Sequence, residues 1–373
     1  MKRFNFVLIL CILLFIFAVL PTNVFALEAT DEATVNENSK QVAEEASADL
    51  LDDIKGLFVK QNQKQNLGEV VLGGVPIGIS LDNEGIEVIG FSEIITQDGL
   101  KSPAADAGLE VGDRIIKING ENVSKVKRLN EIANSQNGKS VVVDYLRDGK
   151  QKRTQILPQK DILTEEYKLG LWAKDVSNGI GTLTFVRGND YFGCLGHPIA
   201  DKNGEIIKIT GGKVYDCLIL GVNKGVKGDA GELKGAFSGK TPIGTIYKNN
   251  KFGVYGKFET MPEKLNSSQK VEVANVCEVK PGKAQIYSTV EENEPKFYDI
   301  EIVKVTNQSQ KDDKGMVVRV VDKTLLEKTG GIVQGMSGSP ILQNGKLVGA
   351  VTHVFVNDPT QGFGMFAQWM LTE

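Results

Sequence analysis

From about residue 165 to its end, the chain carries its hydrophobic residues in short runs that glycine or asparagine separates. No long stretch among these runs repeats with the 3.6-residue period of a helix. Short runs between turn residues are typical of a β-sandwich or a β-barrel. The predicted strands cover residues 180–186, 206–209, 214–220, 244–247, 271–276, 284–289, 300–305 and 316–321. We therefore expect a mainly β fold over this part of the chain.

A different pattern precedes these strands. Residues 102–120 predict a short helix capped by Ser102, a turn at Gly108 and a strand that ends in an Asn-Gly turn. Residues 127–135 predict a second helix. The stretch resembles bacterial PDZ modules of the HtrA protease type, and we assign a PDZ domain to residues 69–158.

The PDZ resemblance also implies a peptide-binding groove. PDZ domains bind an extended peptide as an additional strand at a sheet edge. The second helix would line this groove. The loop that holds the C-terminal carboxylate of the peptide is expected at Gly74, Ile77, Gly78 and Ile79, although Pro76 lacks one of the N–H donors. A PDZ domain that only packs against a neighbouring domain is the alternative.

The N-terminus has the pattern of a secretory signal. Lys2 and Arg3 precede an unbroken apolar run over residues 6–20. As a helix this run is about 22 Å long, which is shorter than the roughly 30 Å hydrocarbon core of a bilayer. We expect a signal peptide over residues 1–26, with a retained membrane anchor as the alternative, and an acidic linker over residues 27–68.

The strongest chemical signal is the turn Gly335-Met336-Ser337-Gly338. Gly-x-Ser-Gly is the local pattern around the active serine of chymotrypsin-like proteases, where glycines allow a sharp turn and backbone N–H groups bind the oxyanion. Ser337 is the predicted nucleophile, and the amides of Gly335 and Ser337 are the predicted oxyanion hole. Residues 340–351 predict a β-hairpin after the turn. A glycine-rich turn without catalytic function is the alternative.

The chain has two histidines, His197 and His353. A serine nucleophile needs a base, and histidine has a pKa near working pH. His197 lies in a loop flanked by glycines and is the predicted base, whereas His353 lies on the strand after the hairpin and is the alternative. Cys194 is close to His197 in the sequence and raises the alternative of a thiol nucleophile, which the serine turn outweighs.

Several segments together resemble the sporulation stage IV B (SpoIVB) peptidase family of endospore-forming bacteria. The segments are Leu169-Gly170-Leu171-Trp172, residues 179–185, Gly196-His197-Pro198-Ile199 and residues 330–354. The resemblance extends over residues 67–373. It implies a PDZ domain followed by a chymotrypsin-like double β-barrel serine peptidase domain over residues 165–373. It also implies His197 as the base and Ser337 as the nucleophile.

The family's important aspartate corresponds to Asp322, which the resemblance implies as the third catalytic residue. An acid that orients the histidine must reach its second ring nitrogen. In chymotrypsin-like proteases this acid follows the histidine within the first barrel, whereas Asp322 lies shortly before the serine. Asp322 could instead shape the substrate pocket, and Asp201, Asp216 and Asp229 stay open as alternatives.

The resemblance implies an exported serine endopeptidase that signals during sporulation. Such an enzyme acts between the forespore and mother-cell membranes, cuts itself near the N-terminal linker, and cuts a membrane-associated regulator to start processing of a late sigma factor. Its PDZ domain would bind a segment of its own chain or a partner. The alternatives are a PDZ adaptor with an inactive peptidase domain and an envelope quality-control protease of broad specificity.

Composition narrows the chemistry further. The net charge is −4, and charges of both signs are spread without a basic block, which argues against a nucleic-acid partner. Three cysteines follow the predicted signal, at Cys194, Cys217 and Cys277, which is an odd number for an exported chain, and their spacing does not suit a zinc site. We therefore expect free, buried thiols rather than a Cys194–Cys217 disulfide. The predicted reaction needs no metal or organic cofactor.

Overall fold

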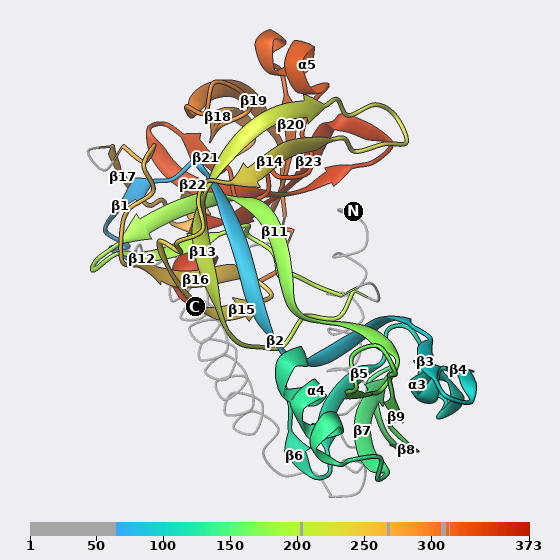
Figure 1. The fold of residues 1–373 in the computed structure, drawn as a ribbon. Helices are drawn as coiled ribbons and strands as arrows, with labels where there is room; N and C mark the ends of the chain where they lie inside the picture. The colour runs from blue at the N-terminus through green and yellow to red at the C-terminus, as the bar shows by residue number, and fades with distance from the viewer. Residues whose placement is uncertain (1–64, 202–203, 267–268, 307–310, 313) are drawn as a thin grey trace, which may run out of the picture. The chain divides into compact units, whose positions relative to one another are not determined.

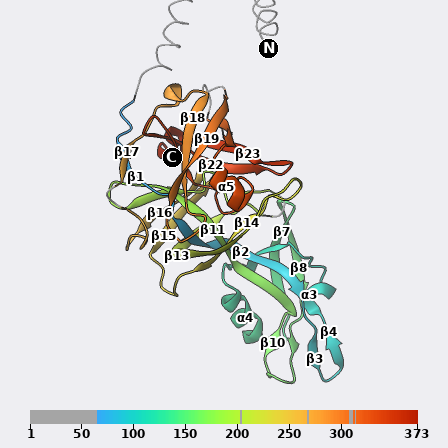
Figure 2. The ribbon, with the colours of Figure 1, turned by 90° about the horizontal axis from the view of Figure 1, so that it is seen from above.

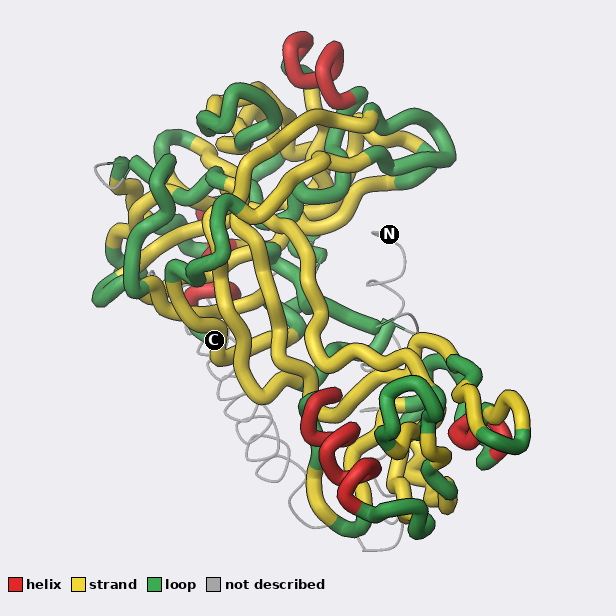
Figure 3. Tube along the Cα trace, viewed as in Figure 1, coloured by secondary structure: helices red, strands yellow, loops and turns green. Residues whose placement is uncertain are grey.

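The structure is a computed structural model that describes residues 65–373 except 202–203, 267–268, 307–310 and 313. The predicted signal or anchor and nearly all of the predicted linker lie outside the described residues. Strands dominate the described chain, as Figure 3 shows, which confirms the mainly β fold class. Within the described ranges, no helix is long and apolar enough to cross a membrane.

The first barrel is a ring of antiparallel strands in which each strand pairs with the next and the last returns to the first. Its interior is filled by alternate apolar side chains such as Ile77, Ile79, Leu183 and Val254. The ring runs β2 (Pro76–Phe91), β11 (Leu171–Arg187), β12 (Tyr191–Cys194), β16 (Gly253–Phe258), β15 (Gly244–Asn250) and β13 (Ile209–Asn223). At its edges, β1 (Glu69–Leu72) pairs with β11 and with β17 (Lys270–Glu272), and β14 (Glu232–Phe237) pairs with β13.

The second barrel is also closed. Its strands, in order around the ring, are β18 (Gly282–Ser288), β19 (Lys296–Val305), β20 (Met316–Val320), β23 (Asp358–Phe366), β22 (Lys346–Phe355) and β21 (Pro340–Gln343). The predicted hairpin is β21–β22, and its turn residues Asn344 and Gly345 have φ values of 53° and 76°, as a type I′ turn requires. Helix α5 (Lys323–Thr329), just before the serine turn, was not expected from the sequence.

Two predicted strands differ from the structure. Residues 206–208 form only an isolated bridge before β13 begins at Ile209, and β17 ends at Glu272, after which a 3-10 turn (Val276–Glu278) follows. The other six predicted strands lie wholly or nearly wholly within β11, β13, β15, β18, β19 and β20. The predicted double barrel is therefore confirmed.

The PDZ domain has its own core, which runs from Ile86 to Leu169. The predicted second helix is α4 (Val126–Ser135), and its buried residues Leu129, Ile132 and Ala133 face this core. Ser102 occupies the N-cap position of α3, but its hydroxyl donates to the carbonyl of Ser92 instead of capping the helix. The remaining elements are β3 (Ile94–Thr96), β4 (Gly99–Lys101), α3 (Pro103–Asp106), β5 (Arg114–Ile118), β6 (Glu121–Asn122), β7 (Val141–Arg147), β8 (Lys150–Ile156), β9 (Gln159–Lys160) and β10 (Tyr167–Lys168).

The PDZ domain is inserted between two neighbouring strands of the first barrel. β2 and β11 pair from Pro76 opposite Thr182 to Phe91 opposite Leu171, so the same two strands belong to the barrel at one end and to the PDZ domain at the other. Figures 1 and 2 show these two long strands side by side. The structure therefore moves the predicted start of the PDZ domain. Residues 69–82, which the sequence placed in it, belong to the first barrel, because β1 pairs with β11 and the side chains of Val75, Ile77, Ile79 and Leu81 fill the barrel core.

The predicted carboxylate-binding loop of the PDZ domain is corrected for the same reason. Gly78 pairs with β11 on one side and with β13 on the other, so no free edge is left there for a peptide. Ile77 and Ile79 are buried in the first barrel, and Gly74 donates its N–H to the carbonyl of Leu183. The alternation of glycine and apolar residues reflects a buried strand, in which a Cβ at Gly78 would overlap the ring of Phe237.

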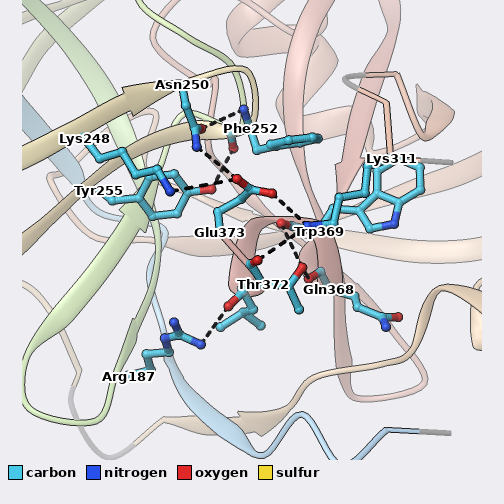
Figure 4. A network of polar contacts seen from close by, with 11 residues as sticks. Arg187, Lys248, Asn250, Phe252, Tyr255, Lys311, Gln368, Trp369, Thr372 and Glu373 are labelled. Atoms are coloured by element: carbon cyan, nitrogen blue, oxygen red, sulfur yellow. Dashed lines mark hydrogen bonds and ion pairs between the residues drawn. The ribbon is translucent and has the colours of Figure 1, made fainter.

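The two barrels are joined by polar contacts around helix α6 (Ala367–Leu371), which follows the last strand of the second barrel (Figure 4). Arg187, at the end of β11, donates from Nη1 to the carbonyl of Leu371 at 2.8 Å. The Glu373 carboxylate accepts from Lys311 at 2.8 Å and from Asn250 of the first barrel at 3.2 Å. These contacts attach the end of the second barrel to β11 and β15 of the first.

Candidate active site

The serine turn follows helix α5 directly. The helix ends at Gly330, whose φ of 75° closes it with a left-handed residue. Within the turn, Gly335 and Gly338 have φ values of 94° and 96°, which are accessible mainly to glycine. A Cβ at residue 338 would also overlap the carbonyl oxygen of Thr182 on β11. Glycine at 338 is therefore a steric requirement of the way this turn packs on the first barrel.

Two backbone N–H groups of the turn are unpaired. Among the described residues, the amides of Gly335 and Ser337 donate no hydrogen bond, whereas those of Met336 and Gly338 donate to backbone carbonyls. An N–H group without a protein partner costs free energy where it is shielded from water, and both Gly335 and Ser337 are partly buried. Two unpaired N–H groups, two positions apart and next to a serine hydroxyl, can bind the negatively charged oxygen of a tetrahedral intermediate.

The directions of these two amides are set by the carbonyls that share their peptide groups. The carbonyl of Gln334 accepts from the amide of Leu233 at 2.8 Å, and the carbonyl preceding Ser337 accepts from the amide of Ser339 at 2.9 Å. In a planar trans peptide, the N–H group points opposite to the C=O group. The N–H groups of Gly335 and Ser337 therefore point away from these partners.

The hydroxyl of Ser337 is half-buried and donates to the backbone carbonyl of Thr352 on β22 at 2.7 Å. The loop that carries His197 packs on the same residue, since a Cβ at Gly196 would lie 2.9 Å from the Thr352 methyl group. The amide of Leu195 also lies against Gly338. The structure thus brings the predicted nucleophile and the predicted base to one place between the two barrels.

The ring of His197 has a defined orientation. Its loop turns sharply after β12 through Leu195 and Gly196, with φ values of 68° and 69°. Nδ1 of His197 lies 2.7 Å from the carbonyl oxygen of Pro198, and a carbonyl can only accept a hydrogen bond. We infer that Nδ1 carries the proton, so that the lone pair needed for proton abstraction lies on Nε2.

His353 is the neighbour of His197, with 4.9 Å between the ring centroids. Desolvation, together with the positive charges of His197 and Lys314, lowers the pKa of His353 to about 4, even though the residue keeps a solvent-exposed side. His353 is therefore neutral at neutral pH and adds no positive charge beside the predicted base.

Asp322 lies at the N-terminus of α5. Its carboxylate accepts from the amide of Leu325 at 2.9 Å and from the amide of Asp299 at 3.3 Å, so both oxygens bind backbone groups. This is the geometry of a helix N-cap. Its predicted role as the orienting acid is not tested by these contacts and stays a prediction.

The three alternative acids lie on separate loops and strands. Asp201 is 3.7 Å from Arg114 of the PDZ domain, the Asp216 carboxylate accepts from the amide of Glu263, and the Asp229 carboxylate accepts from the amide of Gly231. Burial raises the pKa of Asp216. Each carboxylate has a local structural contact of its own.

The cysteines are free in the described chain, as predicted, and Cys194 and Cys217 are buried. Burial raises the pKa of the Cys194 thiol far above its ordinary range, and its Sγ lies 3.3 Å from the carbonyl oxygen of Val254. A buried thiol that does not ionise is a poor nucleophile, so its burial argues against Cys194 as the nucleophile. No group of three or more metal-ligating side chains gathers within the described ranges.

The sequence analysis missed two threonines that contact the serine turn from β11. Thr182 donates from Oγ1 to the carbonyl of Gly335 at 2.8 Å, and Thr184 donates from Oγ1 to the carbonyl of Gly338 at 2.8 Å. Both side chains are buried. The available signal was a pair of polar residues two positions apart, on one face of the buried part of β11 over residues 181–186, whose other large side chains are apolar.

Comparisons with known proteins identify the family of the chain and its PDZ domain. The sequence profile of the SpoIVB peptidase S55 family matches residues 165–371, and a PDZ domain profile matches residues 94–147. A zinc metalloprotease RasP of Shouchella clausii (strain KSM-K16) is 31% identical over 130 residues, which are 34% of this chain and 28% of that protein. A probable periplasmic serine endoprotease, DegP-like, of Bartonella henselae is 40% identical over 60 residues, which are 16% of this chain and 12% of that protein. The chain thus spans less than a third of the length of either curated relative.

Among solved structures, the active form of the Rv3671c protease from M. tuberculosis is similar over 52% of this chain and 70% of that chain. Its sequence identity is 16% and its TM-score is 0.28.

The packing of Gly338 generates a first prediction. We expect Gly338→Ala to abolish peptidase activity and to lower stability, because the new methyl group would overlap the Thr182 carbonyl and the residue would keep a left-handed φ. Activity and the midpoint of thermal unfolding are the measurements. Gly345→Ala, in the hairpin turn where no atom lies within 4 Å of the added Cβ, is the control for backbone strain alone. Full activity of Gly338→Ala would contradict the close contact with β11.

The lowered pKa of His353 generates a second prediction. Between pH 6.5 and about 4, the unfolded chain binds a proton at His353 while the folded protein does not, so the free energy of unfolding falls as the pH is lowered through this window. We expect His353→Gln to remove this part of the pH dependence. Urea unfolding of both proteins at a series of pH values measures the difference. Parallel curves for wild type and variant from pH 6.5 to 4 would show that the folded protein does not disfavour the charged imidazole.

Proposed function

Because this chain belongs to the SpoIVB peptidase S55 family, we propose that its serine endopeptidase activity is carried out by Ser337 as nucleophile and His197 as base. The family profile spans more than half of the chain, and the two barrels and the PDZ domain are those of a serine endopeptidase with a PDZ module. One observation carries the assignment of residues. It is the conjunction of a serine hydroxyl with two unpaired turn amides beside a histidine whose Nδ1 is held by a carbonyl.

The proposed reaction begins when the Ser337 hydroxyl leaves the Thr352 carbonyl by rotation about its Cα–Cβ bond. Catalytic hydrogen bonds are often absent in a free enzyme and form when the substrate binds. His197 Nε2 accepts the hydroxyl proton while Oγ attacks the carbonyl carbon of the scissile peptide. The amides of Gly335 and Ser337 bind the oxygen that becomes negatively charged.

The tetrahedral intermediate collapses when His197 returns the proton to the leaving amine, which leaves an acyl group on Ser337. A water molecule then gives its proton to Nε2 and attacks the acyl carbon in the same geometry. When this second intermediate collapses, the bond from the carbon to Oγ breaks, His197 returns the proton to Oγ of Ser337, and the carboxylic acid product leaves. Throughout, the Pro198 carbonyl keeps the proton on Nδ1, and this tautomer leaves Nε2 able to accept.

The peptide groove of the PDZ domain is proposed between α4 and the beginning of β11. Helix α4 packs near β10 and β11, and its first amide, that of Val126, donates to the Asp175 carboxylate at 3.0 Å. Over residues 171–181, β11 pairs only with β2 among the described strands, so its other edge is open for a peptide strand. The preceding Leu169-Gly170-Leu171 segment, where Gly170 has a φ of 71°, is the corresponding carboxylate loop.

The biological role proposed is that of an exported signalling protease of sporulation. The protease would cut its own N-terminal linker and a membrane-associated regulator, and it would act between the forespore and mother-cell membranes. The family membership and the apolar N-terminal segment after Lys2 and Arg3 support this role. A broad quality-control protease is the second candidate, and the HtrA-type likeness of the PDZ domain favours it.

Self-cleavage tests the proposed nucleophile. We expect the exported wild-type chain to be shortened within residues 27–68, and Ser337→Ala to stay full length while it keeps its fold. Mass spectrometry of the N-terminus identifies the cut bond, and a thermal unfolding scan checks the fold. Identical fragments from both proteins would show that a different protease makes the cut and would remove self-cleavage from the proposal.

The role of Asp322 is tested by Asp322→Asn. Asparagine is as good an N-cap as aspartate, so we expect the variant to keep its stability and most of its activity if the carboxylate only caps α5. Loss of the acid in a serine triad lowers kcat by about 10⁴-fold with the fold intact. The activity of Asp322→Asn beside Asp322→Ala, which removes the cap as well, separates the two roles. A loss near that size in Asp322→Asn would establish Asp322 as the orienting acid.

A further inference from the structure

We infer that Thr182 is a positioning residue for the oxyanion hole. It acts from the first barrel on a serine turn that belongs to the second. The inference rests on the proposed function of Ser337 and adds a residue that makes no contact with the reacting atoms. Thr182 donates its backbone N–H to the carbonyl of Ser337 at 2.9 Å and its hydroxyl to the carbonyl of Gly335 at 2.8 Å. One residue thus holds a carbonyl on each of the two residues that supply the oxyanion donors.

The need for such a partner follows from Gly335 being glycine. A residue with a φ of 94° must be glycine here, and glycine has little intrinsic preference that would keep its two flanking peptide planes in place. The plane before Gly335 is held by the Leu233 amide on the Gln334 carbonyl. The plane after it is held within the turn by the Met336 amide on the Val333 carbonyl, and to β11 by the Thr182 hydroxyl on the Gly335 carbonyl. Without the hydroxyl, the Gly335 carbonyl loses its hydrogen bond to β11, and the turn that carries both donors is held to the first barrel by fewer hydrogen bonds.

The surroundings make this bond effective. Thr182 is only 2% exposed, so water cannot readily replace its hydroxyl as the donor to Gly335. Its own backbone carbonyl accepts from the amide of Leu195 at 3.3 Å, two residues before His197. Thr182 therefore contacts the serine turn through its hydroxyl and the histidine loop through its backbone carbonyl. Among the described contacts, no other hydroxyl-bearing residue of β11 makes both.

The test is the rate at which a fluorophosphonate probe labels Ser337 in the full exported chain. Oγ of Ser337 forms a bond to phosphorus, fluoride leaves, and the hydroxyl proton passes to His197, while the phosphoryl oxygen occupies the oxyanion hole. The probe needs no knowledge of the natural substrate. Thr182→Val removes the hydroxyl but keeps shape, strand and backbone N–H. Thr182→Ser restores a hydroxyl. Thr154→Val is the control in the PDZ domain, where it removes a hydrogen bond of the same kind, from the Thr154 hydroxyl to the Ala107 carbonyl.

We expect Thr182→Val to label about tenfold or more slowly than wild type, because loss of a whole oxyanion donor costs 10²–10³-fold and a misdirected donor costs part of that. Thr182→Ser and Thr154→Val should label close to the wild-type rate. The pH at which labelling is half-maximal should not move in Thr182→Val, since the base is unchanged. A role in folding alone would lower the melting temperature without lowering the rate for the folded fraction.

The outcomes separate the inference from the proposed function. If wild type labels no faster than Ser337→Ala, the proposed nucleophile is wrong. If wild type labels at Ser337 and folded Thr182→Val labels equally fast, only the role of Thr182 is overturned. Should Thr182→Val fail to fold, Thr182→Cys, which keeps a similar size with a much weaker donor, takes its place under the same criteria.

Discussion

The active site depends on the contact between β11 and the serine turn. The turn lies in the second barrel, yet the carbonyls of Gly335, Ser337 and Gly338 all accept hydrogen bonds from threonines of the first. Glycine torsions alone would not hold such a turn, because glycine loses more conformational freedom on ordering than any other residue. The proposed oxyanion donors therefore lie in a turn that is held by hydrogen bonds between the two barrels. The contacts around Glu373 and Arg187, at the C-terminal end of β11, contribute to the docking of the two barrels.

The same strand connects the site to the PDZ domain. β11 begins at Leu171 in the PDZ sheet and reaches Thr182 without leaving its pairing with β2, apart from local shifts of register. A paired ribbon of two strands is stiffer than a flexible linker, because its residues are ordered by hydrogen bonds along their length. The inserted PDZ domain is thus held by two strands, both of which belong to the first barrel.

The sequence could predict what local patterns determine. The short apolar runs indicated the barrels, Asn344-Gly345 indicated the hairpin, and the glycines around Ser337 indicated a sharp turn. The topology was less accessible. Gly78 and its apolar neighbours have the composition of a PDZ loop, and only long-range pairing with β13 reveals a buried barrel strand. The partners of the turn carbonyls were equally hidden, since Thr182 and Gly335 are 153 residues apart. Helix α5 is too short for a 3.6-residue repeat of apolar positions to be recognised in the sequence, although Asp322 and Gly330 cap its two ends.

The Pro198 carbonyl, which accepts the hydrogen bond from Nδ1 of His197, has a consequence for the rate of the proposed reaction. In a serine triad the acid does two things: it keeps the imidazole in the correct tautomer, and its negative charge stabilises the imidazolium that forms during attack. The Pro198 carbonyl can do the first, because it accepts only from a protonated Nδ1. It has no net charge and gives only a dipole for the second. Neutral His353, whose ring centroid lies 4.9 Å from that of His197, neither opposes nor offsets the developing charge. The oxyanion hole then has to supply a larger share of the transition-state stabilisation. In the proposed mechanism, Thr182 therefore supports the part of the site, the oxyanion hole, that carries this larger share.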